Sequence, residues 1–302
     1  MIKITYGTVN EAIDVTDICY TRLVKEDVIT IPAGDINRAK IFTDPQVGVL
    51  KQIILTNLEG NTISRYDDTV KIMIDVWNTD NVFTTCGNID YKLSRIHSKL
   101  KITNGTFKEE LPEQKMVVRY LNGNEKVLEI GGNIGRNSLV IGSILAGNTN
   151  NQFVTLECDE DIAAQLTKNR DLNKMSFKIE SSALSNRKLI QKGWDTIASD
   201  TLLPGYKNVN IISWVELKNK YKIQFDTLIL DCEGAFYYIL MDMPEILHNI
   251  RLIIMENDYH DIFQKNYVDD VLKTNGFTVD YAEKGGWGPC YDKFFEVWIR
   301  RS

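Results

Sequence analysis

The chain has 302 residues, 43% of them hydrophobic, and a formal net charge of −6 at pH 7. This length and composition suit one large domain or two modest ones, each with a buried core. The negative charge is the wrong sign for a general nucleic-acid binder, so we expect no nucleic-acid partner.

Signals for export and for membranes are missing from the sequence. Residues 1–15 lack the basic region and apolar segment of a signal peptide, and no run reaches the roughly 20 apolar residues of a membrane span. Its cysteines are scattered, odd in number and without a CxxC pair: Cys19, Cys86, Cys158, Cys232 and Cys290. This usage indicates a reducing compartment, and we expect a cytoplasmic protein with no membrane partner.

Residues 1–76 are predicted to form a small β-rich domain. The predicted strands are β-branched runs bounded by Gly, Asn and Asp, at 2–7, 27–33, 51–57 and 69–77. We expect a long ordered loop over 32–45 and, over 77–111, a linker with one short helix. The role of this domain is open between acceptor docking and assembly of a homo-oligomer.

Residues 112–302 are predicted to form an α/β domain. A helix begins at Pro112, and strands then alternate with helices. The predicted strands are 126–132, 152–158, 176–184, 225–234 and 251–258, and the predicted helices include 138–147, 161–173 and 234–247. This alternation is typical of a doubly wound, Rossmann-like parallel sheet covered on both faces. The last segment, 276–300, is predicted to close one edge as an antiparallel hairpin.

The turn after the first of these strands, within "VLEIGGNIGRNSL", is the first place to look for a ligand. Glycines there permit positive φ and close approach of backbone. The dinucleotide pattern G-x-G-x-x-G fails, because aligning its last two glycines on Gly132 and Gly135 puts Ile130 at the first. An NAD(P)-dependent oxidoreductase or epimerase therefore remains only as an alternative.

The pattern present instead is E-x-G-x-x-x-G, at Glu129, Gly131 and Gly135, and it resembles motif I of the class I S-adenosylmethionine (SAM) methyltransferases. SAM carries an ammonium, a carboxylate and a sulfonium but no phosphate. Under this resemblance, Glu129 orients the cationic amino-acid end of SAM. The backbone of Gly131, Asn133 and Gly135 then admits the rest of the cofactor.

The next two strand ends carry the remaining cofactor candidates. Glu157 ends the second strand, where an acid commonly holds ribose hydroxyls, and Asp159 is the second candidate for this role. Ser182 and Ala183 follow the third strand. In methyltransferases of this fold that position contacts adenine, and both residues are small enough to allow it.

Several motifs in order make the resemblance more specific. The chain carries "EIGGNIG", "LEC", "NRDLN", "SALS" and "DCEG" in the order seen in the FkbM family of SAM-dependent O-methyltransferases. This likeness covers 112–302 and implies methyl transfer to the hydroxyl of a sugar or glycan. Phe236 stands where the family often has Glu, which leaves open a glycan-binding or partner-binding protein with an inactive methyltransferase domain.

Methyl transfer to oxygen requires an aligned acceptor and removal of its proton. The candidate catalytic residues lie after the fourth and fifth strands. We expect Asp231 or His260 to act as the base, with Glu233 orienting the acceptor or the base. Histidine suits this work near neutral pH.

A metal ion is an alternative means of activating the hydroxyl. Asp231, Glu256 and Asp258 could supply oxygen ligands to Mg²⁺, whereas no His/Cys cluster indicates zinc. Trp287 and Tyr291 could stack on a sugar ring in an acceptor-binding loop, or could be core aromatics of a hairpin.

Overall fold

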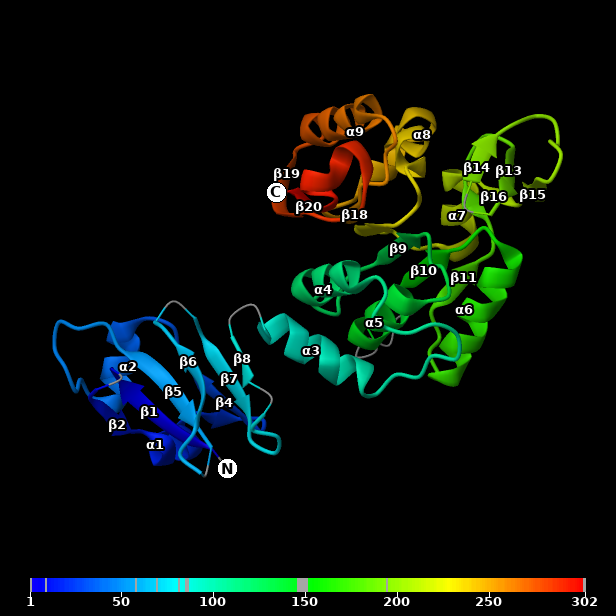
Figure 1. The fold of residues 1–302 in the computed structure, drawn as a ribbon. Coiled ribbons are helices and arrows are strands. Elements are labelled where there is room, and N and C mark those ends of the chain that lie inside the picture. The colour runs from blue at the N-terminus through cyan, green and yellow to red at the C-terminus, as the bar shows by residue number, and fades with distance from the viewer. Residues whose placement is uncertain are drawn as a thin grey trace. The chain divides into compact units, whose positions relative to one another are not determined.

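A computed structural model describes residues 2–8, 10–57, 59–68, 70–80, 82–84, 87–145, 152–193 and 195–300. Predictions for Cys86 and for the end of the helix 138–147 fall outside these residues. The chain divides into two compact units, Met1–Ser94 and Arg95–Ser302, here called the N-terminal and C-terminal units (Figure 1). The predicted boundaries near residues 76 and 111 stay predictions.

The N-terminal unit consists of two four-stranded sheets with two helices. Its elements are β1 (Lys3–Gly7), β2 (Ala12–Asp14), α1 (Thr16–Arg22), β3 (Val24–Lys25), β4 (Val28–Ile31), α2 (Asp35–Phe42), β5 (Gln52–Thr56), β6 (Thr62–Tyr66), β7 (Ile72–Asp75) and β8 (Val82–Phe83). The sheets have the orders β2-β1-β5-β6 and β3-β4-β7-β8. Alternating buried residues of both sheets, among them Ile4, Tyr6, Ile29 and Ile74, form one core.

The prediction of a loop over residues 32–45 is wrong, because α2 occupies most of this segment. Gly34 (φ +90°) precedes the helix and Pro45 follows it shortly, so the expected loop residues are helix boundaries. Arg38 is fully buried, and its guanidinium donates hydrogen bonds to three backbone carbonyls, of Pro32, Asp67 and Val70. These tertiary bonds hold a helix that has a weak apolar pattern of its own.

The remaining elements begin with a helix that crosses the boundary between the units. They are α3 (Gly87–His97), α4 (Leu111–Tyr120), β9 (Val127–Ile130), α5 (Arg136–Leu145), β10 (Phe153–Leu156), α6 (Glu160–Leu172), β11 (Lys178–Glu180), β12 (Ala183–Leu184), β13 (Leu189–Lys192), β14 (Asp195–Ala198), β15 (Lys207–Val209), β16 (Ile211–Ile212), α7 (Trp214–Tyr221), β17 (Thr227–Leu230), α8 (Ala235–Asp242), the 3₁₀ helix η1 (Pro244–Leu247), β18 (Leu252–Glu256), α9 (Ile262–Thr274), β19 (Phe277–Glu283), the 3₁₀ helix η2 (Gly288–Lys293) and β20 (Phe295–Arg300).

A seven-stranded, mostly parallel sheet of order β11-β10-β9-β17-β18-β20-β19 forms the centre of the C-terminal unit. Every residue of β9, β10 and β17 is buried, as expected for strands covered on both faces. Figure 1 shows α4, α5 and α6 together and α8 beside α9. The predicted doubly wound α/β fold is confirmed.

The antiparallel hairpin predicted over residues 276–300 is present at one edge of this sheet. β19 and β20 pair antiparallel, and β20 also pairs antiparallel with β18, so the last strand of the chain lies inside the sheet. The order reverses at β9, which has β10 on one side and β17 on the other. Ligands of doubly wound sheets bind at such a reversal, beyond the carboxyl ends of the strands.

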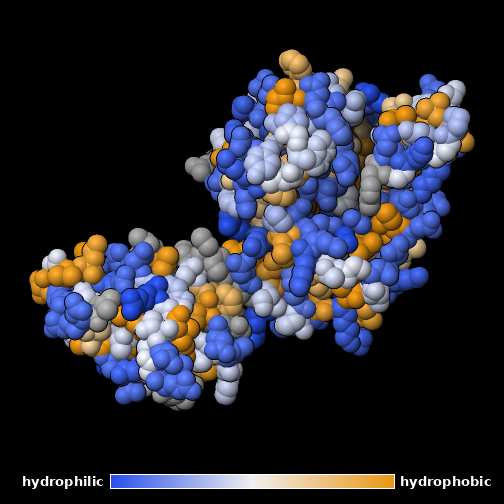
Figure 2. Space-filling view, viewed as in Figure 1, coloured by the Kyte–Doolittle hydropathy of each residue, from blue (hydrophilic) through white to orange (hydrophobic). Residues whose placement is uncertain are grey.

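Two features between β11 and β17 were not expected. The predicted strand 176–184 is split, because β11 joins the central sheet while β12 pairs with β16. A small antiparallel sheet, β14-β13-β15, follows it. Figure 2 shows mainly hydrophilic residues on the visible face, with apolar residues near these strands. Leu202 and Leu203, between β14 and β15, are exposed there.

The cysteines of the described chain, Cys19, Cys158, Cys232 and Cys290, are free thiols. Cys290 is buried. Among the described residues, no helix has both the length and the apolar character needed to cross a bilayer.

Candidate functional site

The glycines after β9 serve close packing of the turn. Gly131 has φ +93°, and a Cβ placed on it would lie 1.6 Å from the backbone oxygen of Asp231. A Cβ on Gly132 would lie 2.2 Å from Thr155 Oγ1, and one on Gly135 (φ +96°) 2.4 Å from Leu166 Cδ1. Side chains at these positions would force the turn away from β17, β10 and α6. The glycines therefore hold the turn directly against the end of β17.

The backbone donors of this turn are all used within the protein. The N–H groups of Gly131 and Gly132 donate to the carbonyl of Leu156, and that of Gly135 donates to the carbonyl of Gly132. The N–H group of Asn133 donates to Glu157 Oε2, and that of Ile134 donates to Asn133 Oδ1. A pyrophosphate bound here would find none of these N–H groups free, although anion sites of this kind depend on them.

Glu157 lies at the end of β10 and against the turn. Its Oε2 accepts a hydrogen bond from the Asn133 N–H (2.9 Å) and its Oε1 accepts one from the Asp159 N–H (2.8 Å). Burial raises the pKa of Glu157, and these two bonds oppose the rise. Each oxygen keeps a further acceptor site. The structure thus brings Glu157 and Asn133 together, while Asp159 caps α6 and forms an ion pair with Lys207.

Glu129 lies beneath the turn. Its carboxylate accepts a hydrogen bond from the Ser138 hydroxyl on α5, and the side chain is 2% exposed. Burial raises the pKa of Glu129 to about 7. The carboxylate therefore faces the helix that follows the turn, and its role toward a cofactor stays a prediction.

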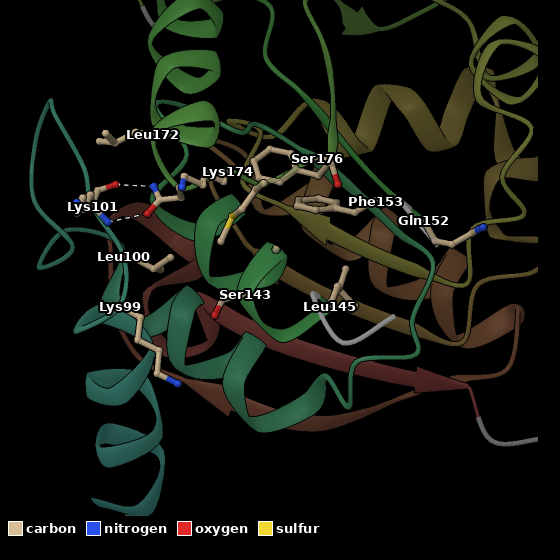
Figure 3. A pocket seen from close by; sticks show the side chains of 14 residues that line it. Lys99, Leu100, Lys101, Ser143, Leu145, Gln152, Phe153, Leu172, Lys174 and Ser176 are labelled. Carbon is tan, nitrogen blue, oxygen red and sulfur yellow. Dashed lines mark hydrogen bonds between the residues drawn. The ribbon is translucent and has the colours of Figure 1, made fainter. Parts of the chain in front are cut away.

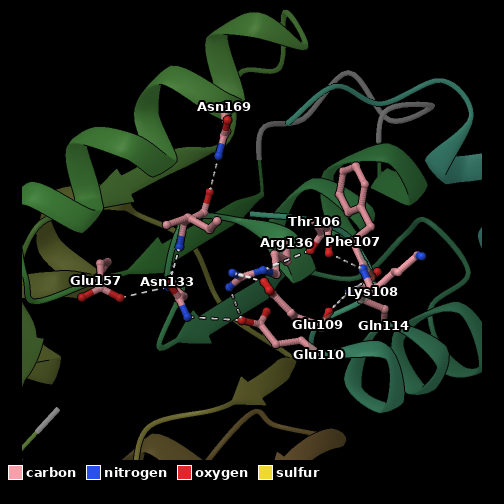
Figure 4. Close-up of polar contacts among 11 residues, drawn as sticks. Thr106, Phe107, Lys108, Glu109, Glu110, Gln114, Asn133, Arg136, Glu157 and Asn169 are labelled. Carbon is pink, nitrogen blue, oxygen red and sulfur yellow. Dashed lines mark hydrogen bonds and ion pairs between the residues drawn. The ribbon is translucent and has the colours of Figure 1, made fainter. Parts of the chain in front are cut away.

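The segment before α4 is fixed onto the turn by a polar network (Figure 4). Asn133 Nδ2 and Arg136 Nη1 both donate to Glu110 Oε1, at 3.2 and 2.8 Å. Arg136 also forms an ion pair with Glu109 and donates from Nε to the Thr106 carbonyl. Sequence reasoning missed Glu110 and Arg136, although an arginine directly after the last glycine and an acidic pair before a helix were visible signals.

Carboxylates from three elements converge beside the turn. Asp231 follows β17, Glu256 ends β18, and Glu113 lies on α4. One carboxylate oxygen of each lies within 4.8 Å of those of the other two. Asp258, two residues after Glu256, is 4% exposed and joins the same group electrostatically. We call these four residues the acidic cluster; Glu113, which sequence reasoning missed, sits on the buried face of α4.

The acidic cluster is electrostatically strained. Burial, followed by repulsion from Glu110 and from the other carboxylates, raises the pKa of Asp231 well above its ordinary range. Burial is also the first cause of the raised pKa values of Glu256 and Asp258. For Glu256 a hydrogen bond with Glu113 and repulsion from neighbouring carboxylates add to it, and for Asp258 repulsion from Glu233 and Glu113 does so. The cluster therefore favours neutralisation, either by protons or by a cation.

Glu233 and His260 extend this arrangement to the surface. Burial raises the pKa of Glu233, and the nearby His260 lowers it. The His260 ring lies 4.4 Å from the ring of Trp287, centroid to centroid. Glu233 adopts φ +51°, a conformation that costs free energy for a residue other than glycine and that is often found at functional sites. The three candidate catalytic residues, Asp231 included, thus lie along one edge of the sheet.

Ser182 and Ala183 take part in local bonds. Ser182 Oγ donates to Glu180 Oε1 (3.0 Å), and the Ala183 N–H donates to the Asn210 carbonyl (2.8 Å). Their proposed contact with adenine stays a prediction.

A cavity of about 460 Å³ lies at the other end of the sheet (Figure 3). It is lined by Lys99, Leu100, Lys101, Gly142, Ser143, Leu145, Gln152, Phe153, Leu172, Asn173, Lys174, Met175, Ser176 and Phe177. Phe153 begins β10, so this cavity is at the amino ends of the strands and is separate from the site described above.

Comparisons with known proteins give only weak likenesses to solved structures. No protein-family model matches the chain, and no curated protein matches it. Among solved structures, the ribosomal protein L11 methylase of Lactobacillus delbrueckii subsp. bulgaricus matches with 10% identity and a TM-score of 0.41, over 67% of this chain and 84% of that one.

Two further solved structures are similar at the same level. The O-methyltransferase of Bacillus cereus in complex with SAH has 13% identity, a TM-score of 0.39 and coverage of 71% of this chain and 90% of its own. A protein in the NADB-Rossmann superfamily from Streptococcus agalactiae has 11% identity, a TM-score of 0.39 and coverage of 62% and 67%. Likenesses this weak say nothing of what the chain binds, and the FkbM resemblance stays a prediction.

Proposed function

We propose that the chain is a SAM-dependent methyltransferase that methylates a hydroxyl group. The observation that carries the proposal is the pairing of a turn whose N–H groups are all used internally with carboxylates on adjacent strand ends. Such a site has acceptors and negative charge to offer. It suits a cofactor that has hydroxyls and positive charge and lacks phosphates, and it does not suit a dinucleotide.

The cofactor fits the donor and acceptor groups present. Glu157, with acceptor capacity left on both oxygens, would hold the ribose hydroxyls. Glu110, at the turn and beside the acidic cluster, would face the cationic amino-acid end. Bound SAM supplies an electrophilic methyl group.

On the acceptor side, the chain's own groups would position a hydroxyl and receive its proton. His260 is exposed at the edge of the site, has Glu233 beside it and carries no hydrogen bond in the described chain that would occupy its ring nitrogens. It is therefore the proposed base. Trp287 against His260 offers an aromatic face, which supports the sugar or glycan acceptor implied by the FkbM resemblance.

The first test is calorimetric titration with SAM, with its demethylated product and with NAD⁺. We expect SAM to bind and NAD⁺ to give no heat. Glu157→Gln should weaken SAM binding about tenfold or more, because a carboxylate that accepts from hydroxyls is replaced by a group with one oxygen. Asp161→Asn, an exposed change nearby on α6, should not alter it.

Binding of NAD⁺ in place of SAM would contradict the proposal, as would a SAM affinity that is the same in Glu157→Gln. Incubation with methyl-labelled SAM and a panel of glycans, read by mass spectrometry, then tests the acceptor class.

A further inference from the structure

The acidic cluster combines three features that ordinary surface carboxylates lack. Three of its members, Glu113 on α4, Asp231 after β17 and Glu256 on β18, each have a carboxylate oxygen within 4.8 Å of those of the other two. Glu113 and Asp258 are both more than nine-tenths buried. No lysine or arginine of the described chain forms an ion pair with any of the four; Arg136, close by, is paired with Glu109 and Glu110.

A second observation concerns unsatisfied atoms. Asp258 Oδ2 and Glu113 Oε2 are buried and have no hydrogen-bond partner in the described chain. A buried carboxylate oxygen without a partner is costly, and native proteins rarely tolerate two together unless something else contacts them. Asp258 lies close enough to Glu256 and Glu113 to interact with both electrostatically.

We propose that Glu113, Asp231 and Glu256 bind one divalent cation, with Asp258 as a further ligand or an acceptor for its water. All the donor atoms are carboxylate oxygens, which favours a hard ion such as Mg²⁺, Mn²⁺ or Ca²⁺ over zinc. The cation would satisfy the unpartnered oxygens and replace mutual repulsion by attraction. The new element is Glu113, which makes α4 part of the site.

The binding itself does not depend on the proposed function, but its role does. At the edge that carries Glu233 and His260, a divalent cation would lower the pKa of an acceptor hydroxyl and so assist its deprotonation. The other cation that could neutralise the cluster is the ammonium group of SAM. The experiment must therefore be done without SAM.

Manganese binding by the full chain gives a direct test. After treatment with a chelator, the protein is titrated with Mn²⁺ and the free ion is followed by electron paramagnetic resonance, with Mg²⁺ and Ca²⁺ as competitors. We expect about one site per chain. Glu113→Gln should weaken Mn²⁺ binding about tenfold or more, and Glu245→Gln, an exposed change in η1, should leave it unchanged.

Melting temperatures separate a lost site from a lost fold. In chelator, Glu113→Gln should melt at or above the temperature of the wild type, because one repelling carboxylate has been neutralised. Added Mn²⁺ should raise the melting temperature of the wild type more than that of the variant. Equal Mn²⁺ affinity in the wild type and a folded Glu113→Gln variant would overturn the proposal, as would absence of binding by the wild type.

SAM titration in chelator keeps this inference distinct from the proposed function. SAM binding together with absent Mn²⁺ binding would remove the metal site and leave the methyltransferase proposal standing. Mn²⁺ binding with no SAM binding would do the reverse.

Discussion

Glu129 shows how one residue can carry a free-energy cost for the fold. Burial raises its pKa from the ordinary 4.5 to about 7, so the folded chain keeps a proton on Glu129 that the unfolded chain has released over this pH range. The free energy of unfolding then falls as pH rises from about 4.5 to about 7, by up to about 3 kcal/mol.

Glu129→Gln should remove this pH-dependent loss of stability. We expect the free energy of unfolding of the wild type, relative to that of Glu129→Gln, to fall as the pH rises from about 5 to about 7, as measured by urea denaturation across the range. The comparison cancels the titration of other groups. A stability difference that does not change with pH would show that Glu129 titrates normally.

Gly131 provides a second prediction at this scale. Gly131→Ala should cost more than about 4 kcal/mol, because its Cβ would overlap the Asp231 carbonyl as well as adopt a left-handed conformation. Gly193→Ala is the matched control, since it also has positive φ but no atom within 4 Å of the added Cβ, and should cost about 1–2 kcal/mol. Equal losses in chemical denaturation would mean that the turn can move away from β17.

At the scale of elements, α2 depends on tertiary hydrogen bonds. Arg38→Met would keep much of the buried volume but leave three carbonyls without their donors, so we expect a loss of about 3 kcal/mol or more in the N-terminal unit. Lys40→Met on the same helix, an exposed position, should change stability by less than about 0.5 kcal/mol. Thermal unfolding followed by circular dichroism would compare the two, and similar losses would contradict this role of Arg38.

The central strands could be predicted from the sequence because each is a short run of mostly apolar residues covered on both faces, as in "TLIL" and "FVTL". The small sheet β14-β13-β15 could not, since its strands are short and carry polar residues. The prediction of a loop over 32–45 also failed, because this segment forms α2, with Gly34 directly before the helix and Pro45 shortly after it.

For the candidate site, the limit of prediction has a different cause. Asp231, Glu256 and Asp258 lie at or just after the carboxyl ends of two neighbouring parallel strands, so topology alone brings them together. Glu113 and Glu110 lie more than a hundred residues earlier, and only the packing of α4 and its preceding segment brings them there. Their proximity is a property of the folded chain that local sequence patterns do not carry.

At the scale of the whole molecule, every candidate site residue belongs to the C-terminal unit. A chain that begins at Gly87, which keeps α3 intact, should therefore bind SAM with an affinity within about twofold of the full chain, by calorimetry. Loss of SAM binding by a truncated chain that circular dichroism shows to be folded would contradict this. Turnover of an acceptor by the same fragment would reveal whether residues 1–86 take part in acceptor recognition.

The contact between Gly131 and the Asp231 carbonyl also bears on how this protein could be re-engineered. Because there is no room for even a methyl group between Gly131 and the Asp231 carbonyl, the turn after β9 packs directly on the loop after β17. A change in the backbone of one would require a compensating change in the other. Trp287 stands outside this contact, and its side chain is exposed. Under the proposed function, altered acceptor preference is therefore best sought by varying Trp287, while His260, the proposed base, and the contact between the two loops are left unchanged.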